Sequence, residues 1–521
     1  MTDSSEGGGG GVAPPGDRAA PHPIYNWMSG IGAALVAVGF TALVFLLLLD
    51  LLHGPASGYS GLALLGPFGL MALGLLLVLA GWLRERRRHA HGRRSSFYET
   101  WVVDPWGIVR GRGLWFVPAV IAVGTFAIFG AGAGTLGLLE FSESNFFCTM
   151  ACHAVMGPEG TAYESTAHSR IACVQCHVGA GPEGFLSAKL GGLRQLYALA
   201  THTVSRPIPT PIHAGNIDRK LCESCHLPER DVGYQARAHT YFLSGDDVER
   251  QRMVMMVKVG RGANGLLPGE GVHYHMQIAQ KVEFVARDPQ LQEIAWVRVT
   301  DPKGNAREYQ LEDKPLSDAE RASQKVHTMQ CIDCHSRPAH RFPSAMESVN
   351  QALEGGLLSH DLPGIKAVAV QALDGGYEST PAALAGIDRT LREYYQEEHP
   401  EVLKERAKDL DASIATLRTI YQRTVFPEMK ADWRAHPDNT GHLNSPGCFR
   451  CHNDKMVDAK GESIATDCTT CHAVLAQNES SIGTMAQFEK GEPFVHPEDG
   501  STFDEFTQCS DCHTGGKELY E

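Results

Sequence analysis

Seven times in this 521-residue chain a pair of cysteines is followed at once by histidine, and these pairs use all fourteen cysteines. The pairs are Cys148/Cys152, Cys173/Cys176, Cys222/Cys225, Cys331/Cys334, Cys448/Cys451, Cys468/Cys471 and Cys509/Cys512. The histidines that follow them are His153, His177, His226, His335, His452, His472 and His513. Six pairs have the spacing C-x-x-C-H, and the first, C-T-M-A-C-H, carries one additional residue. C-x-x-C-H is the attachment signature of c-type haem, in which two thiols bond the porphyrin and the adjacent histidine ligates the iron.

Two other readings of the cysteines are weaker. Cysteine and histidine also build tetrahedral zinc sites, and paired cysteines can form disulfides. Neither reading explains why every pair is trailed by histidine and why no cysteine is left over. The sequence therefore predicts a multihaem cytochrome c with seven covalently bound haem c groups, whose function is electron transfer.

The expected fold is a set of three N-terminal transmembrane helices followed by a mostly α or irregular haem-packed periplasmic domain with a small inserted β element. A bilayer-spanning helix needs about 20 apolar residues. Three stretches meet that requirement: Met28–Leu49, Gly61–Leu83 and Leu114–Leu139. No span carries two interior histidines, so we expect no b-type haem within the membrane.

The charges around these spans set the expected orientation. The loop 84–112 holds eight arginines, whereas Asp50–Ser60 holds neither lysine nor arginine. By the positive-inside rule this loop and the N-terminus are cytoplasmic, and everything after Leu139 is periplasmic. No cleavage site follows the first span, which indicates a signal anchor in a bacterial inner membrane. The net charge of −14 argues against nucleic acid and allows a cationic periplasmic partner.

The chain divides on composition and motif spacing into five regions. Residues 1–23 are a disordered cytoplasmic tail, and 24–140 are the transmembrane region. Residues 141–343 hold four motifs, with a β insertion at about 240–325 whose expected strands are Met253–Val259, Val272–Arg287 and Glu293–Thr300. Residues 344–430 are predicted helical, and 431–521 hold three motifs. The segment Phe185–Thr203 has helical spacing and is expected to lie on the membrane surface.

Six-coordinate haems need distal ligands, and histidines outside the motifs can supply them. The candidates lie in periplasmic segments near a motif: His168, His239, His327, His340, His442 and His496. A structural role is expected for His273 and His275, two residues apart and so on one face of a predicted strand. The roles of His360, His399 and His436 stay open.

Several segments of the chain resemble the membrane-anchored quinol dehydrogenases of the NapC/NirT/NrfH family. In order they are F-C-T-M-A-C-H-A-V-M, Y-E-S-T-A-H-S, C-V-Q-C-H-V-G, K-L-G-G-L-R-Q, R-P-I-P-T-P-I and C-E-S-C-H, followed later by V-H-T-M-Q-C-I-D-C-H-S-R-P-A-H. The resemblance covers about 141–239 and 326–343. The whole layout is similar to the seven-haem inner-membrane cytochromes of metal-reducing bacteria, the ImcH type.

The resemblance implies several residue roles. His168 would be the distal ligand of the fourth haem and His340 that of the second. A methionine after the first motif ligates the first iron in the family, but the longer motif here leaves Met150, Met156 and His153 all open. Lys189 matches the lysine beside the quinol pocket. Gln195 follows in the same segment, well round a helix from it.

The function implied is that of a menaquinol dehydrogenase in anaerobic or metal respiration. It would draw on the membrane menaquinone pool and reduce a periplasmic cytochrome c or periplasmic reductase, as a homo- or hetero-oligomer or alone. Two alternatives remain open at this point. One is a haem-based terminal reductase acting on nitrite or hydroxylamine, and the other is an electron-relay subunit without its own quinol site.

Overall fold

The structure is a computed structural model that describes residues 26–53, 60–91, scattered positions between 102 and 142, and 143–520 with gaps at 152, 179–181, 212–216, 218, 227–232, 261–270, 278–280, 479–490 and 504–506. The chain divides into two units, Met1–Ser142 and Glu143–Glu521. Four features expected from the sequence lie wholly or largely outside the described residues: Cys152, the tail 1–23, the second half of the arginine-rich loop and the third span.

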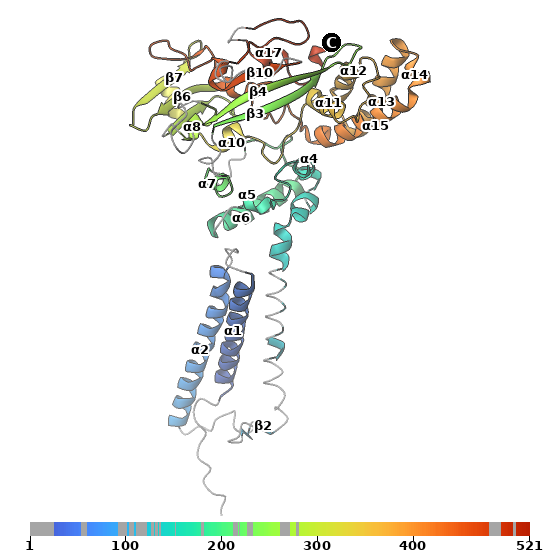
Figure 1. Cartoon of the computed structure of the whole chain (residues 1–521). Helices are drawn as coiled ribbons and strands as arrows, with labels where there is room; N and C mark the ends of the chain where they lie inside the picture. Colours follow the sequence, from blue (N-terminus) through green and yellow to red (C-terminus); the bar gives the residue numbers. More distant parts are fainter. Residues whose placement is uncertain are drawn as a thin grey trace, which may run out of the picture. The chain divides into compact units, whose positions relative to one another are not determined.

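The first unit contains a helical hairpin of α1 (Trp27–His53) and α2 (Ser60–Ala90), drawn in blue in Figure 1. Within the described residues, two helical stretches, Trp27–Leu46 and Leu65–Ala90, are long and apolar enough to cross a membrane. A Cβ added to Gly32 would lie 2.5 Å from the carbonyl oxygen of Gly74. Small residues at such a crossing let two membrane helices approach closely. A short antiparallel pair, β1 (Val102–Val103) with β2 (Val109–Arg110), follows.

The second unit begins with short helices that carry the first three motifs. They are a π-helical turn η1 (Phe147–Ala151), α4 (His153–Glu164), α5 (Cys173–His177), α6 (Pro182–Ala200) and α7 (Arg219–Glu223). Asn145 links the first two motifs, because its side-chain carbonyl accepts from the backbone of Cys173 at 3.0 Å and its amide donates to the Tyr163 hydroxyl at 3.1 Å.

Two antiparallel sheets follow. One has the order β10-β4-β3, with β3 (Gly233–Phe242), β4 (Arg250–Gly260) and β10 (His472–Gln477). The other has the order β8-β5-β6-β7-β9, with β5 (Lys281–Ala286), β6 (Ile294–Thr300), β7 (Ala306–Leu311), β8 (His327–Thr328) and β9 (Met456–Asp458). Strands β9 and β10 come from the C-terminal region. The inserted sheets are therefore completed by chain more than 140 residues further on.

The expected strands agree with the structure in part. Met253–Val259 lies within β4, and Glu293–Thr300 contains β6. Within the expected strand Val272–Arg287, only the later part is strand, as β5. Its beginning is a turn that leads into the short helix α8 (Tyr274–Gln277). A capping box of Ser317 and Glu320 starts α9 (Asp318–Ser323), which precedes the fourth motif.

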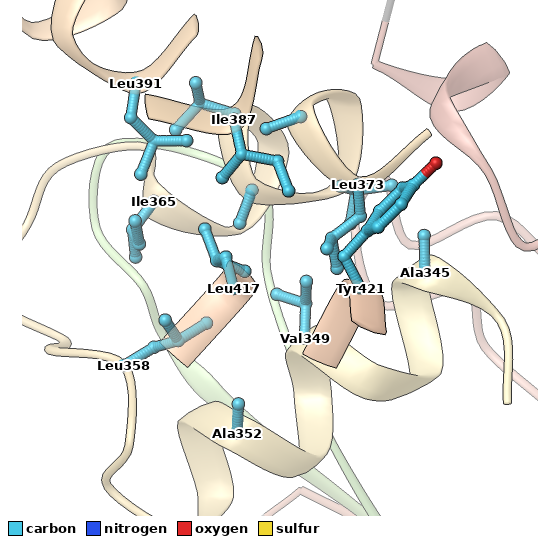
Figure 2. Close-up of a cluster of buried hydrophobic side chains, with 14 of the residues drawn as sticks. Ala345, Val349, Ala352, Leu358, Ile365, Leu373, Ile387, Leu391, Leu417 and Tyr421 are labelled. Atoms are coloured by element: carbon cyan, nitrogen blue, oxygen red, sulfur yellow. The ribbon is translucent and has the colours of Figure 1, made fainter. Parts of the chain in front are cut away.

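Residues 344–430 form a helical bundle of α11 (Ala345–Glu354), α12 (Ile365–Leu373), α13 (Thr380–Glu397), α14 (Val402–Glu405) and α15 (Ala407–Thr424). Ser344 and Ser379 cap α11 and α13 by accepting from backbone amides three residues on. Figure 2 shows the buried apolar side chains that these helices share, among them Val349, Ile387 and Leu417. This bundle supplies the largest apolar core of the unit.

The C-terminal residues form short turns: η2 (Pro427–Met429), η3 (Gly447–Arg450), η4 (Cys468–Thr470), α17 (Cys509–Cys512) and η5 (Lys517–Leu519). Met429 of η2 lies in the apolar core of the bundle. The Trp433 indole donates to the carbonyl of Thr514 at 3.1 Å, and the Met346 amide donates to that of Gly515 at 3.0 Å. The last motif is thereby fixed to the start of α11.

Candidate haem centres

Each described C-x-x-C-H motif adopts a single tight turn. In the fourth and seventh motifs the histidine amide donates to the carbonyl of the first cysteine at 2.8 Å, as His335 does to Cys331 and His513 to Cys509. Residues i, i+3 and i+4 lie on the same face of a helical turn. In such a turn both thiols and the imidazole start from one face, as covalent attachment to one porphyrin requires. The sixth motif differs in that its turn, Cys468–Thr470, is a 3-10 turn and His472 begins a strand.

The first motif has a different turn. Cys148 lies in η1, a π-helical turn, which closes its hydrogen bonds over one residue more than an α-turn. This wider turn matches the additional residue in C-T-M-A-C-H. The neighbouring candidates for the first iron follow closely, with Met150 half exposed in η1 and Met156 partly buried in α4.

The main feature of the second unit is a series of histidine ring pairs. Among the described residues, six pairs each join one motif histidine to one histidine from elsewhere in the chain. The centroid separations are 6.1 Å for His177–His340, 6.0 Å for His226–His168, 6.4 Å for His335–His273, 5.8 Å for His452–His275, 5.9 Å for His472–His442 and 6.0 Å for His513–His496.

These separations fit two imidazoles on opposite sides of one metal ion. A metal–nitrogen bond to imidazole is about 2.0–2.1 Å, so two rings that share an ion in this way have centroids about 6 Å apart. A tetrahedral zinc site would instead need four ligands in one cluster. Within the part of the chain that the structure describes, no group of three or more His, Cys, Asp or Glu side chains gathers in that way. The geometry favours axial pairs over zinc.

The second ring nitrogen of several paired histidines is held by backbone. Nδ1 of His168 lies 3.0 Å from the carbonyl oxygen of Pro338. Nδ1 of His340 lies 3.0 Å from the carbonyl oxygen of Glu159, and Nδ1 of His452 lies 2.8 Å from that of Ala465. Such a contact fixes the tautomer and leaves Nε2 as the nitrogen that can ligate a metal.

His340 has the most extensive support. Arg337 donates through Nε to the carbonyl of His340 at 2.8 Å and through Nη2 to the Glu159 carboxylate at 2.9 Å. Both charged side chains are buried, and their burial raises the pKa of Glu159 and lowers that of Arg337. The pair thus holds α4 and the turn after the fourth motif in one register.

Burial also keeps many of the paired imidazoles neutral. It lowers the pKa of His275 and of His472 to about 4. It lowers the pKa of five further members of the pairs, His177, His340, His442, His452 and His513. A neutral imidazole retains the lone pair that a metal requires, so this electrostatic environment suits ligation.

The motifs are neighbours in space in the order they have in the sequence. The Cys173 thiol is hydrogen-bonded to that of Cys148, which joins the first two motifs. For later motifs, burial is the largest cause of a raised thiol pKa, and a thiol of an adjacent motif raises it further: Cys225 for Cys176, Cys331 for Cys222, Cys448 for Cys334 and Cys471, and Cys468 for Cys509. Each motif thus has a thiol close to a thiol of the next motif in the sequence, and we call this series of seven neighbouring motifs a row.

Space and charge near the fourth motif also suit a porphyrin. An open cleft of about 820 Å³ lies beside His335 and is lined by Arg337, Arg341 and Arg423, among others. Arg337 pairs with Glu159 and Arg341 with Glu347 and Asp438, and Arg423 adds a third guanidinium, a group that binds carboxylates such as the haem propionates well. A single row of paired imidazoles and attachment turns defines the protein as a multihaem c-type cytochrome.

Comparisons with known proteins agree with this class. The profile of the NapC/NirT cytochrome c family, N-terminal region, matches residues 112–208. Cytochrome c-type protein ImcH of Geobacter sulfurreducens is 35% identical over 501 residues, which cover 95% of this chain and 96% of that protein. No solved structure matches the chain. The chain belongs to the NapC/NirT family of membrane-anchored cytochromes c, together with ImcH. Its cofactor is covalently bound haem, and its role is quinol-linked electron transfer in the membrane.

Several of the predicted distal ligands lie opposite a motif histidine, and one of them lies opposite a motif other than the expected one. His340 lies opposite the second motif, the haem expected for it, and His442 and His496 each lie opposite a motif histidine. His168 was expected to serve the fourth haem, but its ring lies opposite His226 of the third motif. The ring that lies opposite His335 of the fourth motif is that of His273, from the inserted segment.

Two predicted ligands lie in other surroundings. His239 is exposed on β3, and the His327 ring stacks on Phe284 at 5.4 Å. Conversely, His273 and His275 were expected to be structural, yet each lies opposite a motif histidine. The sequence predicted a strand for this segment, whereas in the structure Gly271 begins a turn. The G-V-H-Y-H pattern was the available signal.

The three histidines whose roles were left open have contacts away from the motifs. Nε2 of His360 lies 2.7 Å from the Leu353 carbonyl oxygen, and His399 pairs with Asp246 at 3.6 Å. His436 is buried, its Nδ1 lies 3.2 Å from the Thr210 hydroxyl, and burial lowers its pKa to about 4. These contacts indicate structural roles for His360 and His399, whereas Nε2 of His436 is buried with no hydrogen-bond partner among the described residues.

The two residues expected at the quinol site lie on α6. The Lys189 ammonium pairs with the Glu143 carboxylate at 3.3 Å, and both side chains are partly exposed. Gln195 is exposed on the same helix. A row of apolar side chains on α6 also faces solvent: Leu186, Leu190, Leu193 and Tyr197, each at least 59% exposed.

Proposed function

We propose that this protein is an inner-membrane menaquinol dehydrogenase that passes electrons through seven c-type haems to a periplasmic acceptor. The observation that carries the proposal is the row of six imidazole pairs along the series of attachment motifs. Two strong axial ligands leave an iron no open position for substrate, which suits electron transfer rather than catalysis at the metal.

The quinol site is proposed at Lys189 and Glu143. The Lys189 ammonium can donate a hydrogen bond to a quinol oxygen and favour the deprotonated, more reducing ring. The Glu143 carboxylate, 3.3 Å from it, can accept a quinol proton. Oxidation of one menaquinol releases two electrons to the cofactors and two protons, which we assign to the periplasm.

The exposed row on α6 supports a membrane-surface position for this site. Leu186, Leu190, Leu193 and Tyr197 recur at intervals of three and four residues, so they share one face of the helix. An amphipathic helix of this kind buries its apolar face at the level of the lipid headgroups. Menaquinol, which is confined to the bilayer, would reach Lys189 from there.

The arginine-rich loop supports the orientation. A cytoplasmic loop places the N-terminus inside and the motifs in the periplasm. Electrons and protons from quinol then leave on the same side of the membrane. The quinol step would therefore move no charge across the membrane field. The acceptor is proposed to be a periplasmic cytochrome c or a periplasmic reductase.

The test is a pair of charge-removing substitutions on α6. Lys189→Ala should slow haem reduction by a menaquinol analogue at least tenfold, which corresponds to about 1.4 kcal/mol on the barrier. Arg194→Ala removes an exposed positive charge from the same helix and should leave the rate unchanged. Reduction by dithionite should be the same in all variants, because that reductant needs no pocket. Equal menaquinol rates in wild type and Lys189→Ala would reject this quinol site and favour a relay subunit.

A terminal reductase remains the second candidate. Such an enzyme needs one iron with an open face for nitrite or hydroxylamine. The six imidazole pairs argue against an open face at the second to seventh motifs. A high-spin signal in the EPR spectrum of the oxidised wild-type protein, lost on adding nitrite, would favour the reductase.

A further inference from the structure

A single short turn brings two histidines to two different motifs. The segment Gly271–Gln277 belongs to the insertion between the third and fourth motifs. The His273 ring lies opposite His335 of the fourth motif at 6.4 Å, with an interplanar angle of 57°. The His275 ring, two residues on, lies opposite His452 of the fifth motif at 5.8 Å, with an angle of 84°.

Backbone contacts with β4 fix the start of this turn. The Val272 amide donates to the carbonyl of Lys258 at 2.9 Å, and the His273 amide donates to that of Val259 at 3.0 Å. Gly271 has φ +111°, and a Cβ there would lie 2.6 Å from the Lys258 carbonyl oxygen. Only glycine fits both the conformation and the space, so the turn is held in one position.

The far end of the turn is fixed by two other elements. Arg219 of α7, in the third motif region, donates through Nη1 to the carbonyl of Met276 at 3.2 Å. Tyr274 packs against the apolar cluster of the five-stranded sheet, which includes Phe284 and Met456. Nδ1 of His275 lies 3.1 Å from the Val272 carbonyl oxygen, which leaves Nε2 on the side of a metal.

The fourth and fifth motifs are also joined directly. Arg450 is an interior residue of the fifth motif, C-F-R-C-H. It donates through Nη2 to the carbonyl of Asp333, an interior residue of the fourth motif, at 2.6 Å. It also donates through Nη1 to the carbonyl of Leu291 in the inserted sheet region at 2.7 Å. The two attachment turns and the insertion are therefore locked together.

We propose that His273 and His275 are the distal axial ligands of the fourth and fifth haems. The insertion thereby joins the four-motif region to the three C-terminal motifs through one H-x-H turn. This assignment concerns the ligands of the bound cofactors and does not depend on which reductant supplies the electrons. If these ligands are correct, the turn also fixes the distance between the fourth and fifth haems. The importance of that distance for electron transfer rests on the proposed function.

The test uses full-length protein, purified with its haems and oxidised. We expect His273→Ala and His275→Ala each to convert one low-spin iron to high-spin in the EPR spectrum, and the double variant to convert two. Haem content by pyridine haemochrome should equal that of wild type, because attachment needs only the motifs. Added imidazole should restore the low-spin signal. His239→Ala, an exposed histidine on β3, is the matched control and should change nothing.

A second variant tests the proposal in case the alanine variants fail to fold. His275→Met keeps a ligand and should keep the iron low-spin, while raising the reduction potential of one haem in a dithionite titration, as His/Met ligation does. An unchanged EPR spectrum in both alanine variants with full haem content would overturn the proposal. An unchanged set of potentials in His275→Met would do the same for the fifth haem. Neither readout uses quinol, so failure of the proposed quinol site leaves these results independent.

Discussion

Four of the six histidine pairs join residues more than 50 positions apart in the sequence, such as His177 with His340 and His452 with His275. The motif member of each pair could be read from the sequence, because C-x-x-C-H is a local pattern. The distal member could be predicted only in part, because a lone histidine carries no local signal of the ring it will face: His340, His442 and His496 were among the candidates, whereas His273 and His275 were expected to be structural. Both His327 and His273 are histidines outside the motifs, yet the His327 ring stacks on Phe284 and the His273 ring lies opposite His335.

The pairs with His168 and His340 give a prediction at the residue scale. Replacing either histidine by alanine should leave every haem attached and turn one low-spin iron high-spin, because the distal imidazole is lost while the motif remains. EPR of the oxidised protein measures this. His327→Ala should give the wild-type spectrum, since that ring lies against Phe284. Wild-type spectra for both His168→Ala and His340→Ala would show that these rings do not ligate iron.

At the scale of elements, local periodicity and long-range pairing differ in how well they can be predicted. The helices of 344–430 follow from apolar residues at helical spacing and from serine caps such as Ser379. The insertion was recognised from its β-branched residues. The pairing of β9 and β10 with the inserted sheets was not predicted, because pairing with strands more than 140 residues away has no signature in the sequence of either segment alone.

The π-helical turn of the first motif gives a prediction about haem loading. Because η1 is wider than an α-turn, we expect the additional residue of C-T-M-A-C-H to be accommodated and a haem to be attached there. The intact mass of the purified protein should then correspond to seven haems per chain. A mass that corresponds to six, with Cys148 and Cys152 free in a peptide map, would show that the longer motif defeats attachment.

At the scale of the whole molecule, the prediction concerns orientation. The eight arginines of loop 84–112 should keep that loop in the cytoplasm. An alkaline phosphatase fused after residue 521 should be active, because this enzyme matures only in the periplasm, and a fusion at Gly92 should be inactive. The opposite pattern would reverse both the topology and the compartment of the haem centres.

The central claim is that menaquinol reduces this row of haem centres. The most direct measurement mixes the purified wild-type protein with a menaquinol analogue in the absence of oxygen and follows the haem bands in a stopped-flow spectrophotometer. We expect the menaquinol analogue alone to reduce the haems, with no partner protein added. An oxidised spectrum that persists with menaquinol, in protein that dithionite reduces fully, would contradict this claim.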